Sequence, residues 1–176
     1  PGIKYVSVVK ADAYGHGIHP TAARLMQTGV DLFAVANVKE AMDIREMGSG
    51  WPVLILGPLL EEEDQTLLEY NLIPTLSDES ELNRFIKLGK KQGKPLPIHL
   101  KVDTGMGRMG CWWEKAPSLL EKVLQTPEVE LQGVLTHFPL PHDFDFTSLQ
   151  RERFLEVIRP AISAKPNLLV HADNSS

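Results

Sequence analysis

Short apolar runs alternate along the chain with longer segments in which apolar residues recur at helical spacing. Most runs are apolar almost throughout, as strands buried on both faces of a parallel sheet are. In the segments between them, apolar residues fall three or four positions apart, which indicates amphipathic helices. The predicted strands are Tyr5–Val9, Leu32–Ala36, Val53–Leu56, Leu72–Leu76, Ile98–Val102, Gly133–Thr136 and Leu168–Val170.

The predicted helices carry start and stop signals. Asp78 can cap a helix, and Glu81 follows three residues later as in a capping box. Gly48 supplies a stop. The predicted helices cover 38–48, 78–93, a segment after Pro117, and 147–164, and the acidic run Glu61–Asp64 opens another, where negative charge suits the helix dipole.

Seven strands that alternate with helices predict a parallel sheet, built either as a doubly wound sheet or as an eight-stranded barrel. Polar residues follow many of these strands, and a barrel gathers all its strand ends into one mouth. We therefore expect one α/β domain over 1–176, a (β/α)8 TIM-type barrel, incomplete, with about seven of eight strands present. Strands near both ends, without partner elements beyond them, indicate a piece truncated at both ends. The strand-end residues are Lys10, Asn37, Gly57, Lys101, Asp103, His137 and Asn174.

Composition and charge exclude several classes of protein. The 18 Lys and Arg residues are scattered and the net charge is -5, which argues against nucleic acid as a partner. No apolar run approaches the ~20 residues that span a bilayer. Cys111 is the one cysteine, which excludes an internal disulfide, and Pro1–Lys4 lacks a signal-peptide layout. We expect a cytoplasmic protein.

The stretch Lys10–Gly17 is the most informative. A lysine directly after an apolar strand has its amine near the core, which favours the neutral amine that forms an imine with an aldehyde. Gly15 and Gly17 let the backbone turn tightly and approach a ligand closely. Tyr14 offers a hydroxyl group. Taken alone, a strand-end lysine is more often a surface residue.

A second stretch, His99–Gly110, contains a decoy. Its residues Gly105–Gly110 satisfy the G-x-G-x-x-G pattern of dinucleotide-binding folds. That pattern needs a helix opening on the glycines, whereas Cys111–Trp113 follows, and the next strand ends in His137 rather than in an acidic residue. We reject the dinucleotide site. By themselves, Lys101 and Asp103 read as a plain ion pair.

These stretches, together with His171–Ser176, closely resemble alanine racemases, with the three motifs in the family's order. The resemblance runs from Lys4 to Ser176. It implies the pyridoxal-5'-phosphate-binding barrel of fold-type III, and an isomerase that interconverts L- and D-alanine and supplies D-alanine for peptidoglycan.

The resemblance also implies roles for individual residues. Lys10 would hold the cofactor and act as the catalytic base for one enantiomer. Tyr14 would contact the cofactor phosphate, as would Ser175, with Asn174 beside the cofactor; polar groups at strand-to-helix turns suit phosphate. His137 would pack against the pyridine ring. The segment 139–146 departs from the family, being rich in proline and aromatic residues instead of small and acidic ones.

Two further roles are linked. In the family, the arginine at the position of Arg108 points at the cofactor's phenolic oxygen, and the lysine at the position of Lys101 is carbamylated in some members and orients that arginine. A guanidinium needs an anionic partner to fix its rotamer, and a carbamate turns a buried lysine into such an anion.

The resemblance also implies that part of the catalytic machinery lies outside this chain. In the family, the base on the opposite face is a tyrosine from a C-terminal β-domain of the partner subunit, and an arginine contacts the ring nitrogen. We therefore expect a homodimeric full-length protein and an inactive isolated chain. We expect no metal, since His16 and His19 have no further ligands nearby to complete a set.

Two alternatives remain open at this level. A serine or broad-specificity amino-acid racemase shares the same motifs. A non-catalytic pyridoxal-phosphate-binding carrier protein is related by fold, but its relatives lack the Lys10–Gly17 string.

Overall fold

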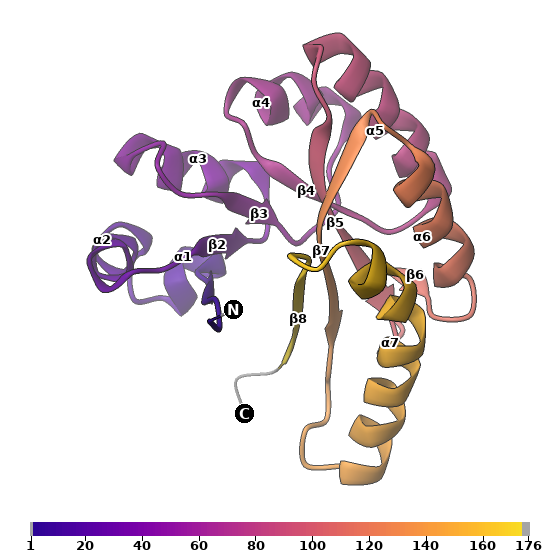
Figure 1. Ribbon diagram of the computed structural model, residues 1–176. Coiled ribbons are helices and arrows are strands. Elements are labelled where there is room, and N and C mark those ends of the chain that lie inside the picture. Colours follow the sequence, from indigo (N-terminus) through magenta and orange to yellow (C-terminus); the bar gives the residue numbers. More distant parts are fainter. Residues whose placement is uncertain (1, 174–176) are drawn as a thin grey trace. The chain divides into compact units, whose positions relative to one another are not determined.

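The computed structural model describes residues 2–173. The chain divides into two compact units, residues 1–75 and 76–176, and each of them repeats strand and helix (Figure 1). No helix in the described range is long and apolar enough to cross a membrane.

The first unit contains parallel strands in chain order. Strand β1 pairs with β2, β2 with β3 and β3 with β4, and Ser7 lies beside Phe33 in the β1–β2 register. The elements are β1 (Val6–Val8), α1 (Lys10–Tyr14), α2 (Ile18–Thr28), β2 (Leu32–Val35), α3 (Val38–Met47), β3 (Val53–Ile55), η1 (Glu61–Glu63), α4 (Asp64–Glu69) and β4 (Ile73–Leu76).

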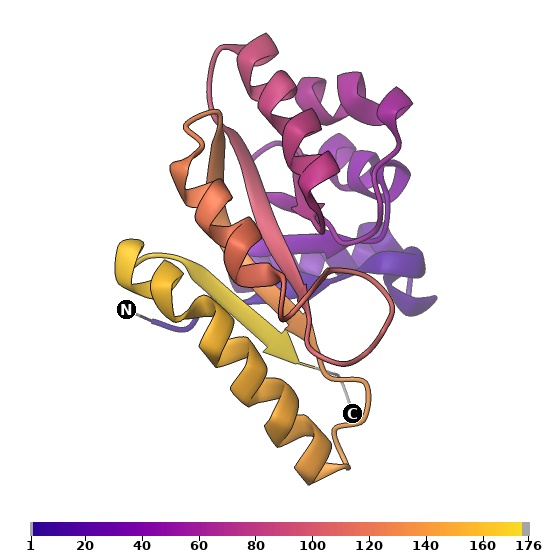
Figure 2. The ribbon, with the colours of Figure 1, turned by 90° about the vertical axis from the view of Figure 1, so that its right-hand side faces the viewer.

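The second unit continues the alternation (Figure 2). Strand β5 pairs in parallel with β7, β7 with β8, and the short β6 lies beside the end of β5. Helix α6 packs on β7 and on α7. The elements are α5 (Glu79–Gln92), β5 (Leu96–Asp103), β6 (Cys111–Trp112), α6 (Ala116–Gln125), β7 (Val129–His137), α7 (Phe144–Ala164) and β8 (Leu169–Asp173).

The strands form the core because their side chains are apolar on both faces. All residues of β2 and β3 are buried, at 4% exposure or less. Helices contribute single stripes, such as the stripe of Leu82, Phe85 and Leu88 on α5. The predicted parallel alternation is confirmed, and every predicted strand has its counterpart within a few residues.

The predicted cap of α5 is also confirmed. The Asp78 side chain accepts a hydrogen bond from the Glu81 backbone N–H at 2.9 Å. In return, the Glu81 carboxylate accepts from the Ser77 N–H at 2.6 Å, one residue before the cap. The two bonds fix the entry of the chain into the helix.

Several features were not predicted from the sequence, the short strand β6 among them. Helix α2 follows Gly17 without a side-chain cap, so its start carries no signal. Strand β7 begins at Val129, earlier than the predicted start at Gly133. Its first half was missed because exposed and buried residues alternate there instead of forming a continuous apolar run. Helix α7 starts at Phe144, where Asp143 caps it by accepting from the Phe146 N–H at 2.9 Å.

Candidate functional site

Lys10 lies two residues after the end of β1, at the start of an unusual backbone segment. The N–H of Val9 donates to the Ala34 carbonyl at 2.9 Å, which continues the β1–β2 pairing up to Lys10. The four residues after Lys10, numbers 11–14, all have positive φ, between 52° and 56°. This left-handed conformation is unfavourable for L-amino acids, at a cost of about 1–2 kcal/mol per residue. The surroundings must therefore enforce it.

Hydrogen bonds close this left-handed turn. The N–H of Gly15 donates to the Ala11 carbonyl, and that of Gly17 donates to the Asp12 carbonyl, each at 3.0 Å. The Asp12 side chain accepts from the N–H of Ile18, the first residue of α2, at 2.7 Å. Both glycines have φ of 86°, as the prediction of a tight turn requires.

The side chains of the turn divide between core and solvent. Val9 and Ala13 are buried, at 2% and 3% exposure. Lys10 is half-buried, and Tyr14 is 58% exposed. Lys10 thus lies at the boundary of the apolar core of the first unit, as predicted from its position after an apolar strand.

In the second unit, Asp103 shapes the loop that carries Arg108. Its carboxylate accepts hydrogen bonds from the backbone N–H groups of Gly105, Gly107 and Arg108 at 3.0, 3.1 and 3.2 Å. Asp103 is buried, whereas the Arg108 side chain is exposed. These backbone hydrogen bonds of Asp103 were not predicted from the sequence, which indicated only an ion pair with Lys101.

Lys101 is buried beneath the same loop, at 5% exposure. A Cβ added at Gly110 would lie 3.0 Å from its Cγ, so the loop closes tightly over the lysine stem. After the loop comes β6, and α6 begins only at Ala116. No helix opens on the glycines, which agrees with rejecting the dinucleotide site.

A buried polar network ties the ends of β5 and β7 to helix α7. The hydroxyls of Thr104 and Thr136 are 2.8 Å apart. The Gln150 amide donates to the Thr104 hydroxyl at 3.1 Å and to the His137 carbonyl at 3.3 Å. Arg153 donates to the Thr104 carbonyl at 2.9 Å. The network holds His137 at the end of β7, and sequence analysis missed it because its members are far apart along the chain.

Two histidines of this unit, the buried His99 and the half-buried His171, lie against each other. His99 Nδ1 lies 2.9 Å from His171 Nε2, with the rings in an edge-on arrangement. Burial lowers the pKa of His99 to about 3 and that of His171 to about 4. Both rings are therefore neutral near pH 7. A Cβ at Gly133 would lie 2.5 Å from the His99 ring, so the glycine makes room for it.

Two other predicted site residues, Asn174 and Ser175, lie outside the described residues. Within residues 2–173, no group of three or more His, Cys, Asp or Glu side chains could hold a metal ion.

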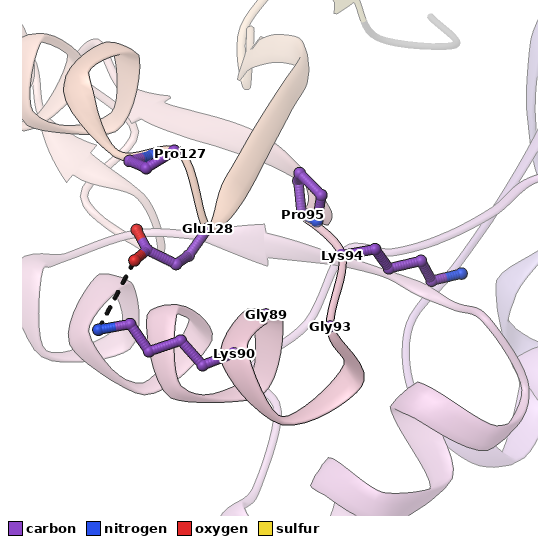
Figure 3. A pocket seen from close by; sticks show the side chains of 7 residues that line it. All are labelled: Gly89, Lys90, Gly93, Lys94, Pro95, Pro127 and Glu128. Atoms are coloured by element: carbon purple, nitrogen blue, oxygen red, sulfur yellow. Dashed lines mark ion pairs between the residues drawn. The ribbon is translucent and has the colours of Figure 1, made fainter.

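A hollow of about 280 Å³ lies at the opposite ends of β5 and β7, away from Lys101 and His137 (Figure 3). An ion pair between Lys90 and Glu128, 3.6 Å apart, crosses one side of it. A Cβ at Gly89 would lie 2.1 Å from the Glu128 carbonyl oxygen, so α5 and β7 approach closely there. We interpret this hollow as a result of packing rather than as a site.

Known proteins with similar sequences point to one family. The model of the alanine racemase N-terminal domain matches residues 1–176. The alanine racemase of Halothermothrix orenii is 34% identical over 99% of this chain and 47% of its own length. That of Carboxydothermus hydrogenoformans is 43% identical over 86% of this chain and 42% of its own. The chain spans about half the length of the curated relatives it matches.

Solved structures agree with the sequence comparisons. An alanine racemase from Clostridium difficile 630 has a TM-score of 0.90 and 27% identity over 98% of this chain and 46% of its own. One from Bartonella henselae, described with covalently bound pyridoxal phosphate, has a TM-score of 0.84 and 26% identity over 98% of this chain and 50% of its own. The predicted fold class, an incomplete (β/α)8 barrel, is confirmed by this likeness.

Proposed function

The chain belongs to the alanine racemase family by its N-terminal domain, and we propose that it forms the pyridoxal-phosphate-binding half of an enzyme that interconverts L- and D-alanine. The observation that carries the proposal is the position of Lys10, half-buried between the end of β1 and a four-residue left-handed turn. Strained backbone of this kind persists mainly at ligand and catalytic sites.

The residues in place fit pyridoxal phosphate chemically. The cofactor presents an aldehyde, a phenolic oxygen and a phosphate. Lys10 offers a primary amine for the aldehyde. Tyr14 offers an exposed hydroxyl for the phosphate. Arg108 offers an exposed guanidinium for the phenolic oxygen, on a loop that Asp103 fixes.

When bound, the cofactor supplies an electron-withdrawing ring that makes the α proton of an amino acid removable. Lys10 Nζ would take that proton from one enantiomer while a base on the opposite face supplies the proton that completes the inversion, and in the reverse direction Lys10 would deliver the proton. His137 would pack its ring against the pyridine, and Asn174 and Ser175 would add polar contacts, Ser175 to the phosphate.

The base for the other face comes from outside residues 1–176, from a C-terminal β-domain of a partner subunit. The active protein is thus a homodimer of longer chains, and the isolated chain does not racemise alanine. Its place is the cytoplasm, where it supplies D-alanine for peptidoglycan.

One experiment separates the candidate functions. The full-length protein is incubated with L-alanine, L-serine and L-lysine, and the D-enantiomer of each is measured. Turnover of alanine well above the others supports the proposal. Comparable turnover of serine or lysine indicates a broad-specificity racemase, and bound cofactor without any turnover indicates a carrier protein.

Lys101 yields a separate prediction. If it carries a carbamate that orients Arg108, then Lys101→Ala should lower racemisation by about 10-fold or more, since a charge-assisted hydrogen bond is lost. Small carboxylates such as acetate should restore part of the activity by replacing the anion. Lys122→Ala serves as the control, because Lys122 is exposed on α6 and pairs only with an exposed glutamate, Glu79, in the described contacts.

A high-resolution crystal structure of the holoenzyme checks this directly. A planar group attached to Lys101 Nζ and directed at Arg108 is expected. A bare ammonium group at Lys101, together with no acetate rescue, would contradict the assignment.

A further inference from the structure

Glu40, on the first turn of α3, connects the chain around Lys10 to the next strand. Its Oε1 accepts a hydrogen bond from the N–H of Ala11 at 2.9 Å. Its Oε2 accepts from the N–H of Ala36 at 2.8 Å. Ala11 directly follows Lys10, and Ala36 directly follows β2. One carboxylate therefore bridges the backbone at two adjacent strand ends within the first unit.

The bridge completes the anchoring of Lys10. On one side, Val9 is tied to β2 by the hydrogen bond of its N–H to Ala34. On the other side, Ala11 opens the left-handed turn, and its N–H points to Glu40. The backbone on both sides of Lys10 is thus fixed to neighbouring elements. A hydrogen bond to an ionised acceptor is stronger than one between neutral groups.

Glu40 is itself well placed for this work. Its own N–H donates to the side chain of Asn37 at 3.0 Å, which caps α3. A negative charge in the first turn of a helix is stabilised by the helix dipole. The rotamer of Glu40 is then fixed by the two amides that it accepts from.

Glu81 shows what a glutamate does when it only caps a helix. It also lies three residues after a capping residue, and it accepts from the N–H just before that residue, at Ser77. Glu40 does the same at Ala36 but adds the bond to Ala11, 29 positions earlier in the chain. Capping α3 does not require that bond. It serves the turn that begins at Lys10.

We propose that Glu40 is a positioning residue for Lys10. The carboxylate of Glu40 holds the left-handed turn so that the amine of Lys10 is presented to the cofactor aldehyde. The inference rests on the proposed function of Lys10. It predicts that loss of the bridge slows attachment of pyridoxal phosphate at Lys10 and lowers kcat, with little change in the KM for alanine.

The test uses Glu40→Gln in the full-length protein. A glutamine keeps the shape, but an NH2 group replaces one of the two carboxylate oxygens, so one backbone N–H would face another donor instead of an acceptor. Amide hydrogen exchange at Ala11 should rise about 10-fold. The rate at which added pyridoxal phosphate becomes fixed to Lys10, trapped by borohydride and followed by mass spectrometry, should fall by a similar factor.

Two other variants sharpen the result. Glu40→Asp keeps the charge but shortens the side chain, so it should reach only one amide and slow attachment as well, even if the glutamine variant folds poorly. Glu46→Gln makes the same charge change at an exposed position of α3 and should change neither rate.

Unchanged exchange at Ala11 and an unchanged attachment rate in both Glu40 variants would overturn the inference. A lower melting temperature with an unchanged attachment rate would overturn it too, since Glu40 would then be only structural. If wild-type protein takes up no pyridoxal phosphate at Lys10, the proposed function fails, whereas the exchange at Ala11 still reports on the bridge.

Discussion

Replacing Lys10 with alanine should lower kcat for alanine racemisation by at least about 10³-fold, the range that a positioned acid–base group contributes. The loss has two sources, because the variant lacks both the amine that holds the cofactor and the atom that moves the α proton. Lys10 is half-buried at the edge of the core. The variant should therefore fold, with a melting temperature close to that of the wild type.

Lys10→Arg should lose activity to the same extent. Arginine is a long basic side chain like lysine, but it cannot form an imine and does not deprotonate in proteins. Lys39→Ala, at an exposed position of α3, is the control and should keep full activity. Racemisation at near wild-type rate by Lys10→Ala would show that another residue performs the chemistry.

The second large effect is a loss of stability in mild acid, caused by the His99–His171 pair. Burial lowers the pKa of these two side chains from 6.5 to about 3 and about 4. Between pH 6.5 and 4 the unfolded chain therefore binds more protons than the folded one. The free energy of unfolding should be highest above pH 6.5 and fall as the pH decreases, by roughly 2–3 kcal/mol per pH unit when both histidines take part.

Urea unfolding at pH 7.5, 6.5 and 5.5 measures this slope. His99→Gln should reduce it by about half, since one of the two proton-binding groups is removed. His19→Gln is the control, because His19 is exposed at the start of α2 and should leave the slope as it is. A free energy of unfolding that stays constant from pH 7.5 to 5.5 would contradict a buried neutral pair.

The strands could be predicted where burial leaves a clear pattern. Leu32–Val35 and Val53–Ile55 are apolar because both faces are covered, so the runs themselves show the strands. The first half of β7 was missed because one of its faces is exposed, so its sequence contains no continuous apolar run. Local signals likewise predicted the Asp78 cap, since a cap and its partner are neighbours in sequence.

The places of the candidate site residues near strand ends could be predicted from the sequence, but the tertiary contacts around them could not. Lys10, Lys101 and His137 could be located because each lies close to the end of a strand. The left-handed turn could not, since among residues 11–14 only Asp12 belongs to a type that adopts positive φ at all readily. Glu40 had a signal, because it lies three residues after Asn37 as in a capping box. Its bond to Ala11, like the contacts of Gln150, depends on tertiary packing that no local pattern encodes.

The central claim is that Lys10 carries the cofactor, and one measurement tests it most directly. The full-length protein, purified with pyridoxal phosphate, is reduced with borohydride, digested, and its peptides are sequenced by mass spectrometry. We expect a phosphopyridoxyl group on Lys10 in proportion to the bound cofactor, and none on any other lysine. A label on a different lysine, or a cofactor that is bound but never fixed by reduction, would contradict it.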